Sequence, residues 1–331
     1  MLIDLSGYSF SGKSALYDIL DSLENVGGFG FESEFELLRA HGGIYELIVA
    51  VSTNPWSPVR SDAAVREFQV LAWNLGGSRS VLKDRMFRLG TYYDDLFPGY
   101  SDAVDRLLKT LVGASWKGHW PFRMFLAHPW KTFINKLCFK MGFSSQGDIY
   151  LSRVDTDYAY EMCRLFLTCL IDSARRSLNV DYVLLNNTFE PSSNDALYSI
   201  VGECVPVVVD RDPRDIYISA WLRSADGVGS AVLGGCVDDF IKRFLTYREA
   251  TNTQGKAIYI MFDDMVTDFD YLSNKLSVLG LPRQDLFNSW EKVTAASSMN
   301  MGLWRRPLPK HIEDDVSRIE DRLSHYCRSR N

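Results

Sequence analysis

Short apolar runs, separated by longer amphipathic stretches, dominate the pattern of this chain. Four of them have the composition of buried strands: residues 2–5, 182–187, 206–211 and 257–266. Helix-forming segments flank each run, including a long amphipathic helix expected over 155–178. This alternation predicts an α/β fold, a three-layer sandwich in which helices cover both faces of a central parallel sheet.

The middle of the chain differs from its two ends. Residues 60–150 have helical patterns and no convincing strand. We therefore expect a single domain over residues 1–331 that carries a largely helical insertion at 60–150. Near the C-terminal end, four apolar residues share one helical face, which predicts a terminal helix that packs against the rest: Ile312, Val316, Ile319 and Leu323.

The first predicted strand leads into a glycine-bounded loop. Residues 7–14 spell G-x-x-x-x-G-K-S, and the helical pattern ALYDILDSL follows at once. In such a loop the backbone N–H groups point inward, the helix dipole favours negative charge, and Lys13 adds a full positive charge. The segment therefore predicts a binding site for a phosphate-like group.

A second segment narrows the choice of ligand. The loop alone is typical of a nucleoside triphosphatase or kinase, which also needs a carboxylate for Mg²⁺; Asp210 and Asp263 are the candidates. However, the sequence RDPRDIYIS places Arg211 at the end of a strand and Ser219 one to two turns into a helix. A fixed guanidinium and a hydroxyl on one side of a pocket favour a second anion site.

Together these segments resemble the sulfotransferases that use 3′-phosphoadenosine-5′-phosphosulfate (PAPS), in particular the bacterial carbohydrate-acting ones. In that family a P-loop-like segment binds the 5′-phosphosulfate. A motif of the form R-[DN]-P-R-D-x-x-x-S binds the 3′-phosphate through its first Arg and its Ser, which correspond to Arg211 and Ser219. The segment SSMNMGLWRRP also resembles the family's loop that closes over the nucleotide, with Gly302, Trp304 and Arg305 as candidates.

The resemblance covers about residues 1–40 and 180–306. It implies a P-loop NTPase-like sheet, PAPS as sulfuryl donor and no metal. Lys13 would neutralise the charge that builds on the bridging oxygen as the sulfuryl group leaves. The implied phosphosulfate-binding residues lie together in the loop: Ser9, Phe10, Ser11, Gly12, Lys13, Ser14 and Ala15. A P-loop kinase that uses ATP and Mg²⁺ is the enzymatic alternative.

Sulfuryl transfer to a hydroxyl or amine also needs a general base. The resemblance implies a His or, in carbohydrate-acting branches, a Glu. Glu34 is our first candidate and Glu32 the second, although either could equally be a capping or solvated carboxylate. His119 is the rival base, and Glu190, after a predicted strand, is a weaker candidate. Two further residues could orient the acceptor or the cofactor: Arg39 and His41.

Composition restricts the partners and the compartment. The net charge of −6 argues against nucleic acid as a partner. The six cysteines are dispersed without a C-x-x-C pair, which indicates free thiols in a reducing compartment. We find no signal peptide and no apolar run of about 18 residues, so we expect a cytoplasmic protein.

One segment reverses the overall charge. Residues 106–147 contain no acidic residue, but seven Lys or Arg, three Trp and five Phe. A packed subdomain with core aromatics explains this pattern, and so does contact with a membrane, a lipid-linked acceptor or a soluble anionic acceptor. For 106–147 a packed subdomain is our first interpretation, and peripheral contact with the inner face of the membrane is the second. We expect a carbohydrate or glycolipid acceptor, with small phenolic or lipid alcohols as the second choice. A nucleotide-binding scaffold without enzymatic activity is the other alternative.

Overall fold

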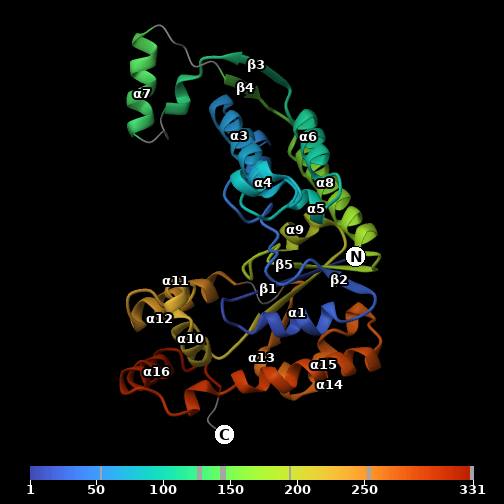
Figure 1. Ribbon diagram of the computed structural model, residues 1–331, viewed down its shortest axis with the longest axis vertical. Coiled ribbons are helices and arrows are strands. Elements are labelled where there is room, and N and C mark those ends of the chain that lie inside the picture. Colours follow the sequence, from blue (N-terminus) through green and yellow to red (C-terminus); the bar gives the residue numbers. More distant parts are fainter. Residues whose placement is uncertain (53, 125–128, 142–146, 194, 252–254, 329–331) are drawn as a thin grey trace. The chain divides into compact units, whose positions relative to one another are not determined.

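The computed structural model describes residues 1–52, 54–124, 129–141, 147–193, 195–251 and 255–328 (Figure 1). The chain forms two compact units. The first unit comprises Met1–Phe35, Leu178–Ser199 and Glu203–Asn331. The second unit comprises Glu36–Ser177 and Ile200–Gly202, so it extends beyond the predicted 60–150 insertion on both sides.

The first unit is built on a five-stranded sheet in the order β2-β5-β1-β6-β7, with all neighbours parallel. Three of the predicted strands form as expected. The fourth run, 257–266, is a strand only as far as Met261, because Asp263 and Asp264 then occupy the first turn of a helix, where carboxylates are stabilised. The strands are β1 (Leu2–Gly7), β2 (Val26–Gly28), β5 (Tyr182–Asn186), β6 (Cys204–Asp210) and β7 (Ile258–Met261).

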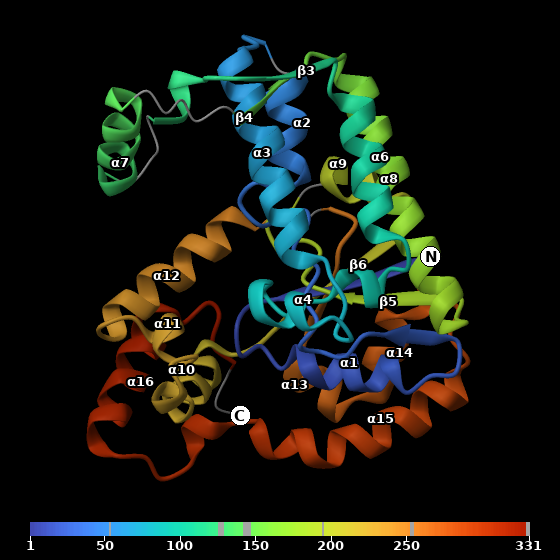
Figure 2. The same cartoon turned by 45° about the horizontal axis from the view of Figure 1, so that its top comes forward.

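Helices cover this sheet, and the expected α/β fold with a central parallel sheet flanked by helices is confirmed. Leu2, Ile3 and Leu5 of β1 are completely buried, as expected for a strand covered on both faces. One apolar cluster joins the sheet to four helices, which Figure 2 shows together. They are α1 (Lys13–Asp21), α13 (Phe262–Thr267), α14 (Phe269–Lys275) and α15 (Arg283–Ser297).

A second apolar cluster of the first unit contains the C-terminal helix. Its Ile312, Val316 and Ile319 are buried, as is Leu323 just after it, so the predicted docking of a terminal helix is confirmed. The helices of this cluster are α10 (Pro213–Leu222), α11 (Ser230–Leu233), α12 (Val237–Ala250) and α16 (Lys310–Arg322). A short helix, α9 (Asp195–Tyr198), follows β5.

Where the structure describes the second unit, it is helical apart from one hairpin that we did not expect. The strands β3 (Ala114–Gly118) and β4 (Gly147–Leu151) pair antiparallel, from Ala114 opposite Leu151 to Gly118 opposite Gly147. Most side chains of β3 are exposed. The strand therefore has no alternation of apolar and polar residues from which it could be predicted. The helices are α2 (Ile44–Ser52), α3 (Pro58–Leu75), α4 (Leu82–Phe87), α5 (Tyr93–Leu96), α6 (Tyr100–Leu111), α7 (Pro129–Lys140) and α8 (Thr156–Leu178).

Within the described ranges, no helix is both long enough and apolar enough to cross a bilayer.

Candidate functional site

The glycine-bounded loop, residues 7–14, follows β1 at the carboxyl edge of the parallel sheet. Phe10 and Gly12 have positive φ angles of 61° and 84°. A Cβ atom on Gly12 would lie only 2.1 Å from the Phe262 ring, so both the backbone angle and the close approach require glycine there. Helix α1 begins directly at Lys13, and no side chain caps its N-terminus. The loop therefore has the geometry expected of an anion cradle.

Lys13 is connected to the first-choice base through one amide. The lysine is buried, and its Nζ donates a hydrogen bond to Oδ1 of Asn187. The Nδ2 of Asn187 donates in turn to Oε1 of Glu34 at 2.6 Å. Asn187 directly follows β5 and has a φ of 56°, a left-handed conformation that Asn tolerates better than most residues. Asn187 was not among the site residues predicted from the sequence, although Glu190 of the same segment was.

The other candidate bases are placed differently. Glu32 is exposed, and Glu190 is partly buried beyond β5. His119 belongs to the second unit, where it is exposed just after β3. Arg39 and His41 also belong to the second unit, and Arg39 pairs there with Glu36. Of the candidate bases, Glu34 is hydrogen-bonded to the loop lysine through Asn187.

The second predicted anchor contacts the loop directly. Arg211 is 4% exposed at the end of β6, and its Nη1 donates to Oγ of Ser219 at 3.0 Å and to the Phe10 carbonyl oxygen at 3.1 Å. Its Nη2 donates to the carbonyl oxygen of Asn300. The guanidinium carbon lies 4.9 Å from the centroid of the Phe262 ring. Segments about two hundred residues apart in the chain thus meet at one guanidinium.

Several buried polar atoms of this region have no hydrogen-bond partner among the described residues. Two of them are Oγ of Ser11 in the loop and Nε of Arg211. A buried donor without a partner costs about 1–3 kcal/mol, so such atoms commonly face a ligand or water. Burial also lowers the pKa of Arg211, against the opposing effect of Asp215. Both atoms suit the oxygens of an anionic ligand.

The loop that resembles a nucleotide-closing segment is fastened to α10. The carboxylate of Asp215 accepts from the backbone N–H of Gly302 at 2.8 Å and of Trp304 at 3.4 Å. Burial raises the pKa of Asp215 to about 6, although neighbouring Arg211 acts to lower it. The Trp304 ring also lies 3.7 Å from the guanidinium carbon of Arg214. Gly302 and Trp304 are therefore held in position by buried charges.

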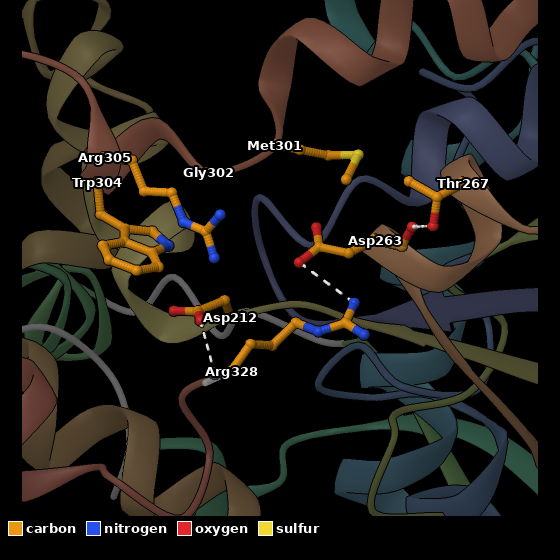
Figure 3. Close-up of a pocket in the computed structure, with 8 residues that line it drawn as sticks. All are labelled: Asp212, Asp263, Thr267, Met301, Gly302, Trp304, Arg305 and Arg328. Atoms are coloured by element: carbon orange, nitrogen blue, oxygen red, sulfur yellow. Dashed lines mark hydrogen bonds and ion pairs between the residues drawn. The ribbon is translucent and has the colours of Figure 1, made fainter. Parts of the chain in front are cut away.

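A cavity of about 460 Å³ lies beside this segment (Figure 3). The backbone N–H of Arg328 donates to Asp212 at 2.9 Å, and its Nη1 lies 3.4 Å from Oδ2 of Asp263. In Figure 3 the guanidinium of Arg305 points into the space between Trp304 and Asp263. A volume of this size suits a small-molecule ligand. The lining residues are Asp212, Asp263, Thr267, Met301, Gly302, Trp304, Arg305 and Arg328.

Both carboxylates that could hold Mg²⁺ for a kinase are paired with arginines. Asp210 accepts from the N–H of Arg211 at 2.6 Å and forms an ion pair with Arg248. Asp263 pairs with Arg328. Burial raises the pKa of both carboxylates. Each carboxylate is thus paired with an arginine, and Oδ1 of Asp263 has no hydrogen-bond partner among the described residues.

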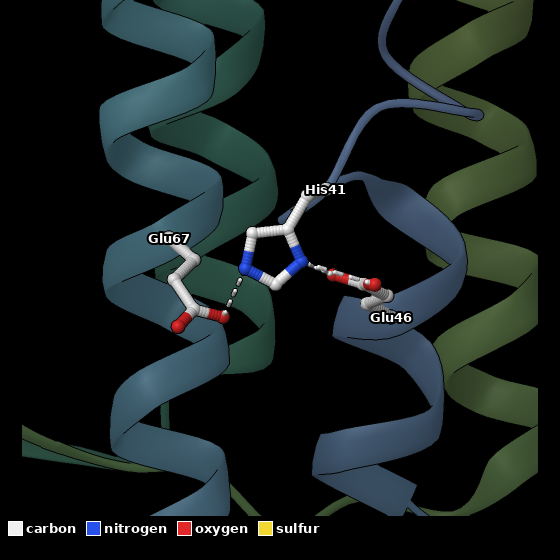
Figure 4. Close-up of side chains that lie close together, drawn as sticks. All are labelled: His41, Glu46 and Glu67. Carbon is white, nitrogen blue, oxygen red and sulfur yellow. Dashed lines mark hydrogen bonds and ion pairs between the residues drawn. The ribbon is translucent and has the colours of Figure 1, made fainter. Parts of the chain in front are cut away.

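In the described part of the chain, one group of side chains is close enough to share a metal ion: His41, Glu46 and Glu67 (Figure 4). The imidazole lies between the two carboxylates, with Nδ1 3.1 Å from Glu46 and Nε2 3.9 Å from Glu67. One metal ion binds a single imidazole nitrogen, whereas here each nitrogen faces a different carboxylate. The arrangement is that of an exposed imidazole placed between two surface carboxylates.

Comparison of the chain with protein-family models, with curated proteins and with solved structures found no significant match. Its function has to be inferred from the geometry of the site.

Proposed function

We propose that this chain is a PAPS-dependent sulfotransferase with a P-loop-like fold, which transfers a sulfuryl group to a hydroxyl or amine of a carbohydrate or glycolipid. One observation carries the proposal: Arg211 joins Ser219 to the Phe10 carbonyl of the glycine-bounded loop. PAPS carries a phosphosulfate and a 3′-phosphate, so it requires two anion sites on one ligand. The unpaired Ser11 and Arg211 atoms offer a donor at each of them.

The sheet topology supports this assignment. The chain passes from β5 to β6 across β1, which lies between them. In open parallel sheets, ligands bind beyond the carboxyl ends of the strands where the connections diverge in this way. The loop follows β1 and Arg211 follows β6, so both anchors belong to that edge.

The proposed reaction is an in-line displacement. The acceptor oxygen or nitrogen bonds to sulfur, and the bond between sulfur and the bridging phosphate oxygen breaks, which releases adenosine 3′,5′-bisphosphate. Glu34 accepts the acceptor proton, and Lys13 neutralises the charge that develops on the bridging oxygen. The amide of Asn187 is hydrogen-bonded to both side chains and so fixes their relative position. Ser9, Gly12, Ser14 and Ala15 complete the proposed phosphosulfate site.

Ligand-dependent stability tests the proposal most directly. We expect adenosine 3′,5′-bisphosphate to raise the melting temperature in the presence of a chelator. At a ligand concentration one hundred times Kd, the free energy of unfolding should increase by about 2.7 kcal/mol. Arg211→Ala removes this shift, and Ser219→Ala reduces it less, which keeps the test valid if loss of the arginine perturbs folding. Arg283→Ala is the control, because Arg283 is an exposed arginine paired with Asp270.

The alternatives give different outcomes. If ATP with Mg²⁺ stabilises the protein and the bisphosphate does not, the chain is a kinase and the proposal is wrong. Incubation with labelled PAPS and glycan extracts then tests the transfer itself. Tight binding of the bisphosphate without labelling of any fraction would instead indicate a nucleotide-binding scaffold.

A further inference from the structure

Helix α7 belongs to the second unit and is labelled in Figure 1. It has an exposed apolar stripe. Trp130 is 65% exposed, Phe133 56%, Ile134 43% and Leu137 47%, and Met141, directly after the helix, is 56% exposed. Their spacing places these side chains on one helical face. The Trp130 and Phe133 rings stack with their centroids 5.6 Å apart. These side chains are therefore not core residues, as a packed subdomain would require.

Positive charge flanks the stripe on both sides. At about 100° per residue, Lys131 lies beside one edge of the stripe, and Lys136 and Lys140 lie beside the other. The helix has no acidic residue, nor has the whole of 106–147. Trp116 and Lys117 of strand β3 are exposed as well. A strongly positive surface with exposed aromatic rings thus belongs to a chain whose net charge is −6.

We propose that α7 is a membrane-docking helix that lies in the interface of a bilayer containing anionic lipids. Its apolar stripe enters the boundary between headgroups and acyl chains, where Trp is favoured. The lysine stems lie along this apolar surface, and their ammonium groups reach the lipid phosphates. The 12-residue helix is about 18 Å long, well short of the ~30 Å hydrocarbon core, so it lies along the surface.

A lipid surface suits this face better than a second copy of the chain. Pairing of one α7 with another would bring six lysines together without a carboxylate from either helix. Anionic lipids supply the missing negative charge together with an apolar phase. This inference does not depend on the sulfuryl-transfer proposal.

Vesicle flotation of the full chain tests it. We expect flotation with phosphatidylcholine vesicles that contain roughly one third phosphatidylglycerol, weakening with salt, and none with phosphatidylcholine alone. Phe133→Ser with Leu137→Ser should weaken binding about tenfold or more, and so should Lys131→Gln with Lys136→Gln and Lys140→Gln. The control is Leu89→Ser, because Leu89 is 69% exposed in the same unit and lies outside α7.

Three results would overturn the proposal. The first is the absence of flotation with the anionic vesicles. If the wild type is then a dimer in sedimentation velocity and the Phe133→Ser, Leu137→Ser variant is a monomer, the stripe is an interface between two copies of the chain. The second is equal binding to neutral and anionic vesicles that the lysine substitutions do not weaken, which would show that anionic lipid is not required. The third is full vesicle binding by the Phe133→Ser, Leu137→Ser variant, which would show that another surface contacts the membrane. All these variants should keep the melting temperature of the wild type, which verifies their folding without reference to any ligand.

Discussion

The two units treat polar and apolar side chains in opposite ways. Around the glycine-bounded loop the first unit buries charge: Lys13, Arg211 and Asp215 are each less than a tenth exposed. Helix α7 of the second unit exposes apolar rings instead, as Trp130 and Phe133 show. Both arrangements depart from the ordinary distribution of side chains in a globular protein, and each supports one of the two proposals above.

The physical costs of the two arrangements differ. A buried ion loses several kcal/mol of solvation, which only well-placed partners offset, and Arg211 accordingly meets Ser219, Phe10 and Asp215. Exposed apolar groups on α7 need no partner in the isolated chain, but they become more stable when water is excluded. The first unit therefore resembles a preorganised site, whereas α7 resembles a surface that is completed by its partner.

Lys13→Ala should produce the largest effect on the first unit. Loss of the positive charge at the leaving oxygen is expected to lower sulfuryl transfer from labelled PAPS about 10³-fold. Flotation with anionic vesicles should stay unchanged, because Lys13 is buried in the first unit. Lys275→Ala, which removes an exposed lysine, is the control. If Lys13→Ala transfers the sulfuryl group as fast as the wild type, the loop lysine has no role in the reaction.

Glu34→Gln should come next. The amide cannot accept the acceptor proton, so we expect kcat to fall about 10²-fold, while the stabilisation by adenosine 3′,5′-bisphosphate is retained. Glu32→Gln is the matched control, because Glu32 is exposed. If Glu32→Gln loses activity and Glu34→Gln does not, the second candidate is the base.

Asp4→Asn tests how much charge burial costs in the first unit. Burial raises the pKa of Asp4 to about 7 from 3.8, although its hydrogen bonds with Thr188 oppose the rise. Between these two pKa values the folded chain retains a proton that the unfolded chain has lost, so this group stabilises the fold less as the pH rises.

The variant lacks this titration. Its free energy of unfolding relative to the wild type should therefore increase by about 2 kcal/mol from pH 5 to pH 7, as measured by urea denaturation. Glu24→Gln, at an exposed position, should show no such pH-dependent difference. If the free energy of unfolding of Asp4→Asn relative to the wild type is the same at pH 5 and pH 7, the pKa of Asp4 is not raised by burial.

Asn187 should give the smallest effect. We expect Asn187→Gly to lower kcat about tenfold, because Lys13 and Glu34 lose the amide that connects them. Glycine accepts the φ of 56° without strain, so we expect Asn187→Gly to lose only the stability contributed by the two hydrogen bonds, about 1–3 kcal/mol. Asn187→Ala should lose activity similarly and about a further 1–2 kcal/mol of stability, because alanine does not favour this φ. Full activity in Asn187→Gly would deny the amide a positioning role.

The local pattern predicted the elements whose signals lie within a few residues. The apolar runs predicted β1, β5 and β6, and the helical face of Ile312 and Val316 predicted the docking of the terminal helix. The glycine spacing predicted a tight loop before α1, and Gly12 indeed has a φ of 84°. Such signals are readable because periodicity and turn chemistry are properties of neighbouring residues.

Other elements had no local signal. The strand β2 has the sequence VGG, and β3 is mostly exposed, so both are strands because of their partners. The connection from Lys13 to Glu34 through Asn187 joins three separate segments. Arg328 near the C-terminal end lines the cavity without belonging to any motif that we recognised.

The amino-acid sequence was sufficient for the α/β class, for the glycine-bounded loop between β1 and α1, and for the basic aromatic character of 106–147, since composition and spacing carry that information. Folding in three dimensions made Arg211 the meeting point of both anchors, selected Glu34 rather than Glu32 as the partner of Asn187, and left the α7 stripe exposed. These outcomes depend on contacts between residues far apart in the chain. Whether a side chain is buried, paired or exposed is a property of all its neighbours together.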